Sequence, residues 1–194
     1  EEQLSNKFGE VKGLLDGREI KYGEILPIEP APSRYAYRNK MEYTFGDMVK
    51  DGPMTLGMHK KGHFMSIVTV DECQLVHEDF NKILRATLEF VNDKGYKHYH
   101  KRRHTGLMRH LIIRSGVRTG EILVNICTAS DKCPLGDPAD LNNAPEKSNV
   151  AAEKSNVAAE IFDEAAYVET IKKLNLENKV VGVLRTINDR LADA

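Results

Sequence analysis

A basic segment in the middle of the chain is the first place where the residue types suggest a chemical role. Residues 94–120 contain eight Lys and Arg and no Asp or Glu, although the whole chain has a formal net charge of −1. Lys and Arg bind phosphates and release their counterions, and the interleaved Tyr96 and Tyr99 can stack on bases. The segment therefore predicts a nucleic-acid surface, with a solvent-exposed linker as the simpler alternative.

The same segment is rich in histidine, which raises a second hypothesis, a metal-dependent hydrolase. The residues concerned are His98, His100, His104 and His110. A zinc site needs three or four ligands, so these histidines would be sufficient in number. The surrounding cations oppose a divalent ion and no carboxylate lies nearby, so we favour nucleic acid over metal.

Two strands position the end of this basic segment. Leu, Ile and Val are dense in residues 107–114 and 121–128, and the connection at 115–120 holds two glycines that permit a tight turn. Apolar side chains fall on both faces of each strand, a pattern typical of strands that are covered on both sides. We therefore place this hairpin at the centre of a sheet.

The rest of the chain alternates strand and helix patterns. Strands are predicted at residues 35–46, 54–59 and 64–70, which form an antiparallel meander, and at 179–186; helices are predicted at 1–16, 77–92 and 160–174. The fold class is therefore α+β, an antiparallel β-sheet flanked by α-helices. No apolar run reaches the roughly 18 residues that span a bilayer, so we expect no membrane partner.

Two further features concern cysteine and repetition. Cys73, Cys127 and Cys133 are odd in number and no two form a C-x-x-C pair, which favours a reducing, cytoplasmic location over a disulfide scaffold. The heptapeptide EKSNVAA at residues 146–152 recurs at 153–159. Two seven-residue copies are too few for a solenoid, so we interpret residues of about 134–160 as a variable surface insert.

Several local motifs, taken in their order along the chain, resemble the S-adenosylmethionine (SAM)-dependent RNA uracil-C5 methyltransferases, which make 5-methyluridine in 23S rRNA and tRNA. The motifs are QL-x-x-K from Gln3, YRNKMEY at 37–43, LGMHK at 56–60, the strand ending at Cys73, HTGLMRHL at 104–111, TGEILVN at 119–125 and residues 183–189. No one motif is diagnostic, but their shared order is specific.

The resemblance implies that this chain is a fragment, the central domain of such an enzyme. Residues 1–17 would form an N-terminal helix that docks on the missing catalytic domain, and residues 18–194 the central α/β domain. The SAM loop and the catalytic cysteine would lie outside this chain. Many relatives bind a [4Fe–4S] cluster through four cysteines, and Cys73 corresponds to one of these ligands in the full-length parent only.

The resemblance also implies how the fragment works. It would bind RNA, either rRNA or tRNA, and help to position the uridine. The expected RNA contacts are Arg38, Lys40, Lys101, Arg102, Arg103 and Arg109. The alternative is a structural spacer with no specific RNA affinity. We also expect that uncovered docking surfaces favour self-association of the fragment.

Overall fold

The computed structural model describes residues 2–50, 52–101, 105–130 and 161–190, which belong to two compact units divided between Arg34 and Tyr35. The predicted insert at about 134–160 and its repeated heptapeptide lie outside the described residues. The sequence-based division at residue 17 separates the first helix alone, whereas the compact first unit also includes the segment that follows that helix.

The first unit consists of one helix and an extended segment. Helix α1 spans Glu2–Gly17 and buries no residue. Leu4 and Phe8 on the helix, together with Ile25 and Pro27 in the extended segment, line a shallow groove. The predicted amphipathic helix is thus present, and its apolar side is only partly covered within its own unit.

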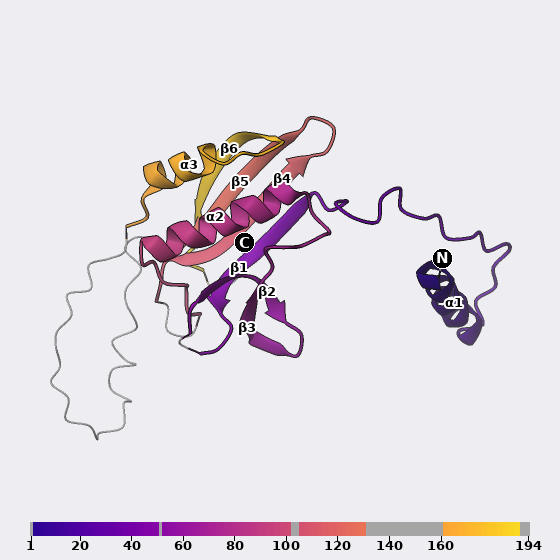
Figure 1. Cartoon of the computed structure of the whole chain (residues 1–194). Helices are drawn as coiled ribbons and strands as arrows, with labels where there is room; N and C mark the ends of the chain where they lie inside the picture. Colours follow the sequence, from indigo (N-terminus) through magenta and orange to yellow (C-terminus); the bar gives the residue numbers. More distant parts are fainter. Residues whose placement is uncertain (1, 51, 102–104, 131–160, 191–194) are drawn as a thin grey trace, which may run out of the picture. The chain divides into compact units, whose positions relative to one another are not determined.

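The second unit is built on a six-stranded sheet with the strand order β3-β2-β1-β4-β5-β6 (Figure 1). The strands are β1 Lys40–Asp47, β2 Met54–Lys60, β3 His63–Thr69, β4 Met108–Gly116, β5 Glu121–Thr128 and β6 Lys179–Ile187. The predicted meander and hairpin are confirmed: β1 and β4 occupy the middle of the sheet, and β4 pairs with β5.

One strand departs from the antiparallel prediction. β6 runs parallel to β5 in register from Glu121–Lys179 to Thr128–Ile187, so the sheet is mixed. A parallel neighbour needs a crossover connection, and helix α3, Glu164–Lys172, lies in that connection. The α+β class holds, with a parallel strand at one edge.

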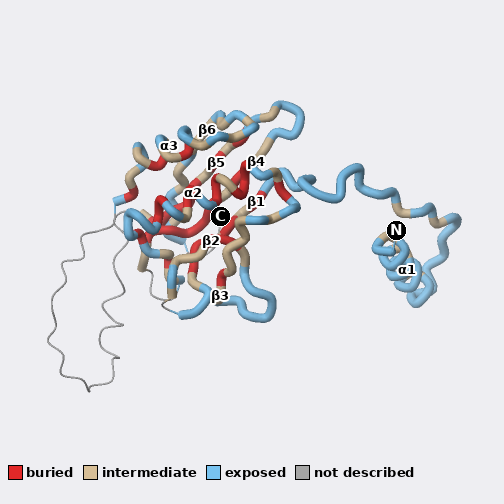
Figure 2. Tube along the Cα trace, viewed as in Figure 1, coloured by how far each residue is buried: buried red, intermediate tan, exposed pale blue. Residues whose placement is uncertain are grey.

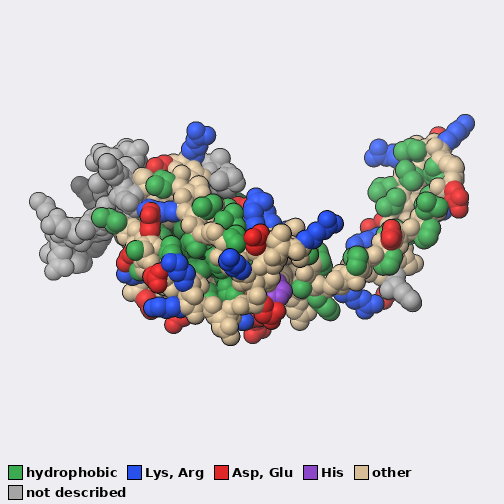
Figure 3. Space-filling view, turned by 90° about the horizontal axis from the view of Figure 1, so that it is seen from above, with side chains coloured by type: hydrophobic (Ala, Val, Ile, Leu, Met, Phe, Trp, Pro, Cys, Tyr) green, Lys and Arg blue, Asp and Glu red, His purple; other side chains and the backbone are tan. Residues whose placement is uncertain are grey.

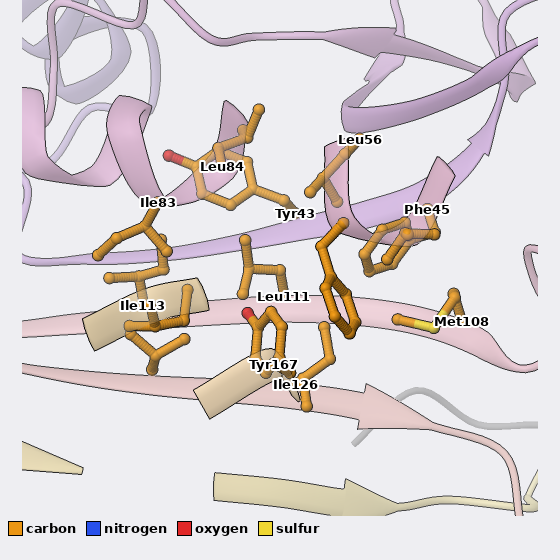
Figure 4. Packing of buried hydrophobic residues seen from close by; sticks show 14 of the residues in the cluster. Tyr43, Phe45, Leu56, Ile83, Leu84, Met108, Leu111, Ile113, Ile126 and Tyr167 are labelled. Carbon is orange, nitrogen blue, oxygen red and sulfur yellow. The ribbon is translucent and has the colours of Figure 1, made fainter. Parts of the chain in front are cut away.

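The hydrophobic core lies on one face of the sheet, beneath α2, Glu78–Asp93, and α3. Register-paired side chains from the strands, such as Tyr43 with Leu111 and Ile113 with Val124, point into it. Ile83 and Leu84 of α2 and Tyr167 of α3 cover them (Figure 4). Figure 2 shows this buried layer running through α2 and the middle strands.

The opposite face, which we call the helix-free face, carries no helix among the described residues of the second unit, whereas the sequence pattern predicted a central hairpin covered on both sides. Ile112 and Leu123 on that face are only partly buried, and their neighbours across the strands include the polar Glu42 and Asn125. Cys127, farther along β5 on the same face, is buried. Around Ile112 and Leu123, the described residues therefore do not provide the second cover that the apolar side chains on both faces had indicated. Among these residues, no helix combines the length and the apolar composition needed to cross a bilayer.

Candidate nucleic-acid interface

Two cations face each other across the central strands on the helix-free side of the sheet. Lys40 opens β1 and is the register partner of Arg114 on β4, and both side chains are exposed. Ser115 donates a backbone hydrogen bond to the Asn39 carbonyl at 2.8 Å, which continues the ladder by one residue. Regular strand pairing therefore holds the two positive charges side by side.

A shallow hollow of about 310 Å³ lies at these two cations. Its lining residues are Asn39, Lys40, Arg114, Ser115, Gly116, Glu121, Leu123 and Val181. The lining combines cations, an amide and aliphatic side chains, with one carboxylate, Glu121. Such a surface has donors for phosphate and base oxygens and apolar area for a sugar or a base face.

Lys40 has one ionic neighbour in this region. Its Nζ atom lies 3.5 Å from Oε2 of Glu42, and both side chains are partly exposed. Exposed ion pairs contribute little, about 0–1 kcal/mol. The pair therefore does not prevent the Lys40 ammonium from binding a phosphate.

Arg38 lies just before β1 in a segment fixed by its backbone. The Arg38 N–H donates to the Leu75 carbonyl, and the Ala36 N–H donates to the Gln74 carbonyl, each at 2.9 Å. The Arg38 side chain is exposed, and the neighbouring Tyr37 ring is 57% exposed. Tyr37 therefore adds an exposed aromatic surface next to Arg38. Our sequence-based site included Arg38 but omitted Tyr37, although both residues belong to the YRNKMEY motif.

The predicted basic block is described only in part. Lys101 is exposed at a turn that follows an isolated bridge between His100 and Thr105. Arg102 and Arg103 lie outside the described residues. The Lys101 side chain is thus at the surface, and its contact with RNA stays a prediction.

Arg109 differs from the other predicted contacts because it is buried, with 3% exposure. Its Nη1 atom donates to the Asn188 carbonyl at 2.8 Å and to the Arg190 carbonyl at 2.7 Å. These bonds hold the chain that leaves β6. The guanidinium does not face solvent, so we remove Arg109 from the RNA contacts and assign it a structural role.

The two tyrosines predicted to stack on bases are also buried. Tyr99 is covered by the Arg109 guanidinium, whose Cζ lies 4.4 Å from the ring centroid. Tyr96 packs against Phe90 and Phe162, and its hydroxyl donates to the Ile161 carbonyl. Neither ring is available to a base, which corrects that expectation.

The histidines do not gather into a described metal site. Nδ1 of His110 lies 3.4 Å from the Thr44 hydroxyl, and His104 is outside the described residues. Over the described ranges, no three His, Cys, Asp or Glu side chains come together in a group that could hold a metal ion. The metal-dependent hydrolase therefore gains no structural support.

Cys73 is a half-buried thiol after β3, held by hydrogen bonds between its backbone and the Asn81 side chain. Tyr43 is a neighbour: burial is the main cause that raises the pKa of the Tyr43 hydroxyl, and electrostatic interaction with Cys73 adds to it. A [4Fe–4S] cluster needs four thiolates, and the chain has three cysteines. The residues of this chain alone do not fit such a cluster.

The basic side chains do not form one continuous patch on the face that Figure 3 shows. Figure 3 shows Lys and Arg interspersed with Asp and Glu on the face seen from above. A local pair such as Lys40 and Arg114 is therefore a more specific feature than the overall charge, which is close to neutral.

Comparison with known proteins gives relatives over the full chain, although no family model matches it. The chain is 39% identical over 193 residues to an uncharacterized RNA methyltransferase of Clostridium tetani and 36% identical over 194 residues to one of Caldanaerobacter subterraneus. Each alignment covers 100% of this chain and 36–37% of the relative. The chain thus spans little more than a third of the length of these relatives.

Part of the chain is also similar to solved structures. One of them is a tRNA (uracil-54, C5)-methyltransferase of Pyrococcus abyssi in complex with S-adenosyl-L-homocysteine, with a TM-score of 0.48 and 24% sequence identity. The match covers 71% of this chain and 31% of the other.

Proposed function

Because this chain is homologous over its full length to a segment of bacterial proteins named RNA methyltransferases, we propose that it is the RNA-contacting part of a SAM-dependent RNA (uracil-5-)-methyltransferase. In this proposal the chain binds rRNA or tRNA and helps to position the target uridine. The SAM site and the catalytic thiol belong to parts of the parent protein outside this chain.

The observation that carries the proposal is the cross-strand pair of Lys40 and Arg114 on the helix-free sheet face, beside the hollow. Two exposed cations on regular strands form a fixed pair of phosphate ligands. Arg in particular can bind a phosphate with two hydrogen bonds. Arg38 and Lys101 extend the proposed surface.

Sheet faces are effective platforms for single-stranded RNA because bases can lie flat on them while cations bind the backbone. Here the face offers Leu123 and Val181 within the hollow, and the exposed Tyr37 ring lies three residues before Lys40 in the sequence. The side of the sheet under α2 and α3 is filled by the core. The helix-free face is therefore the side on which an RNA strand can lie.

The alternative is a spacer domain that only orients its neighbours and has no specific RNA affinity. Both hypotheses share the fold, so they differ only in where RNA touches the chain. Ultraviolet crosslinking of the chain to RNA that contains 4-thiouridine, followed by peptide mapping, separates them. RNA contact predicts crosslinks concentrated in residues 37–42 and 112–116, whereas the spacer predicts weak crosslinks spread over the basic surface.

A further inference from the structure

The β2–β3 hairpin carries a second set of features suited to binding nucleic acid, and these lie outside the proposed site on the sheet face. Residues 54–69 contain two lysines and two histidines and no Asp or Glu. Lys60 pairs with His63 across the turn, and Gly62 closes the turn with φ of +78°. The four basic residues His59, Lys60, Lys61 and His63 thus gather at the exposed tip of a two-stranded ribbon (Figure 2).

An aromatic ring at this tip has one face occupied and one face open. The rings of His59 and Phe64 stack at 4.8 Å between centroids with an interplanar angle of 4°. Phe64 is nevertheless 70% exposed. Since the stack covers only the side toward His59, the outer face of the Phe64 ring is open to solvent.

A hydrogen bond holds this stack in place. Nδ1 of His59 lies 2.6 Å from the Phe64 carbonyl oxygen. A carbonyl can only accept, so His59 carries its proton on Nδ1 and donates it. The bond fixes the imidazole plane and therefore the orientation of the Phe64 ring that stacks on it.

The core does not explain the position of Phe64. The hydrophobic core lies beneath α2 and α3, and neither Phe64 nor Met65 belongs to it. Lys60, Lys61 and His63 form no ion pair with any described residue. A fixed, open ring face beside two lysines that have no ion pair among the described residues is a combination with which proteins bind single-stranded nucleic acid, by stacking and by phosphate neutralisation.

We propose that the β2–β3 tip binds an unpaired nucleotide of RNA, with the base stacked on the outer face of Phe64 and the adjacent phosphates bound by Lys60 and Lys61. The inference rests on the proposed function for the choice of RNA over another polyanion. It adds a stacking site for an unpaired nucleotide to the phosphate-binding pair of Lys40 and Arg114 on the sheet face.

The test uses two RNA probes of the same stem. One is a stem-loop with 2-aminopurine in its unpaired loop, and the other is the fully paired duplex. Stacking on an aromatic ring quenches 2-aminopurine fluorescence, so quenching reports the proposed contact directly. We expect quenching on binding of the unaltered chain and of Phe64→Tyr, and its loss with Phe64→Leu.

Affinity gives the second readout. Phe64→Leu should weaken stem-loop binding about tenfold and leave duplex binding and the salt dependence unchanged, because one stacking contact is lost. Lys60→Ala with Lys61→Ala should reduce the slope of log K against log salt by about 0.7 per lost phosphate contact. Met65→Ala is the matched control, an exposed apolar neighbour that should change neither.

The outcomes distinguish this inference from the proposed function. If the Phe64→Leu variant quenches 2-aminopurine and binds the stem-loop like the unaltered chain, the proposed tip site is wrong. That conclusion holds even if Lys40 and Arg114 contribute to RNA binding. If Met65→Ala weakens binding as much as Phe64→Leu, and the Lys60 and Lys61 variant keeps the salt slope of the unaltered chain, the tip is an apolar protein-docking surface. The inference is then overturned. If the unaltered chain binds neither probe, both proposals fail.

Discussion

The guanidinium of Arg109 lies over the ring of Tyr99, with Cζ 4.4 Å from the ring centroid, while Nη1 binds the carbonyls of Asn188 and Arg190. One buried side chain thus connects the segment before β4 to the chain after β6. These contacts join parts of the sequence about 80 residues apart, which makes Arg109 a structural residue of the sheet unit.

Replacing Arg109 by Met should destabilise the fold by about 3 kcal/mol, because charged hydrogen bonds and a cation–π contact are lost from a buried site. Urea unfolding measures the change. Arg118→Met, at an exposed position on the β4–β5 turn, should stay within about 0.5 kcal/mol. An Arg109 variant of unchanged stability and weaker RNA binding would return this residue to the interface.

Asp79 should make stability depend on pH. It is fully buried and accepts hydrogen bonds from the backbone N–H groups of Glu177 and Asn178. Burial favours the neutral acid, but these hydrogen bonds and the Asn178 side chain outweigh it, so the pKa of Asp79 lies below its ordinary value of 3.8. A lowered pKa stabilises the fold above pH 3.8, and that stability is lost as pH falls through the folded-state pKa.

Asp79→Asn should therefore cost about 2 kcal/mol at pH 7, since hydrogen bonds to a charged acceptor are weakened. The cost should shrink as pH falls below 3.8. Urea unfolding at several pH values measures both, with the exposed Glu89→Gln on α2 as the control. A cost that is the same at every pH would show that the Asp79 charge is unimportant.

Two buried tyrosines should respond oppositely to loss of their hydroxyl. The Tyr167 hydroxyl lies 2.9 Å from the Thr87 hydroxyl, which itself donates to the Ile83 carbonyl. The Tyr43 hydroxyl is buried with no hydrogen-bond partner among the described residues. Tyr167→Phe should cost about 1 kcal/mol, whereas Tyr43→Phe should be neutral or stabilising.

Thermal unfolding of the two Phe variants side by side tests this contrast, because both changes remove one oxygen from the same core. Equal losses in both would show that the Tyr43 hydroxyl makes a hydrogen bond in solution.

Much of the sheet could be predicted because its signals are local. Alternating Met41, Tyr43 and Phe45 predicted a strand with one buried face, and the glycines at 116 and 120 predicted the β4–β5 turn. The order of short motifs likewise predicted similarity to RNA methyltransferases, which the full-length relatives confirm. Each of these signals depends on residues close in sequence.

Features that depend on distant partners were not predictable in this way. The parallel pairing of β6 depends on a crossover, and Asp79 reaches residues 177 and 178. Arg109 and Tyr99 resembled solvent-exposed members of a basic run, yet they are buried against each other. Arg114 was overlooked as a site residue because its pairing with Lys40 becomes apparent only in the strand register.

A salt series measures whether RNA binds the helix-free face at Lys40 and Arg114. The slope of log K against log salt is measured for structured RNA with the unaltered chain, with Lys40→Ala plus Arg114→Ala, and with Lys172→Ala plus Lys173→Ala. The last variant removes the same charge at the end of α3, on the core side of the sheet.

We expect the Lys40 and Arg114 variant to have a slope shallower by about 0.7–0.9 for each of two phosphate contacts, and the α3 control to keep the slope of the unaltered chain. Equal slopes for all three proteins would contradict this expectation. The spacer hypothesis would then hold, and RNA recognition would belong to other parts of the parent protein.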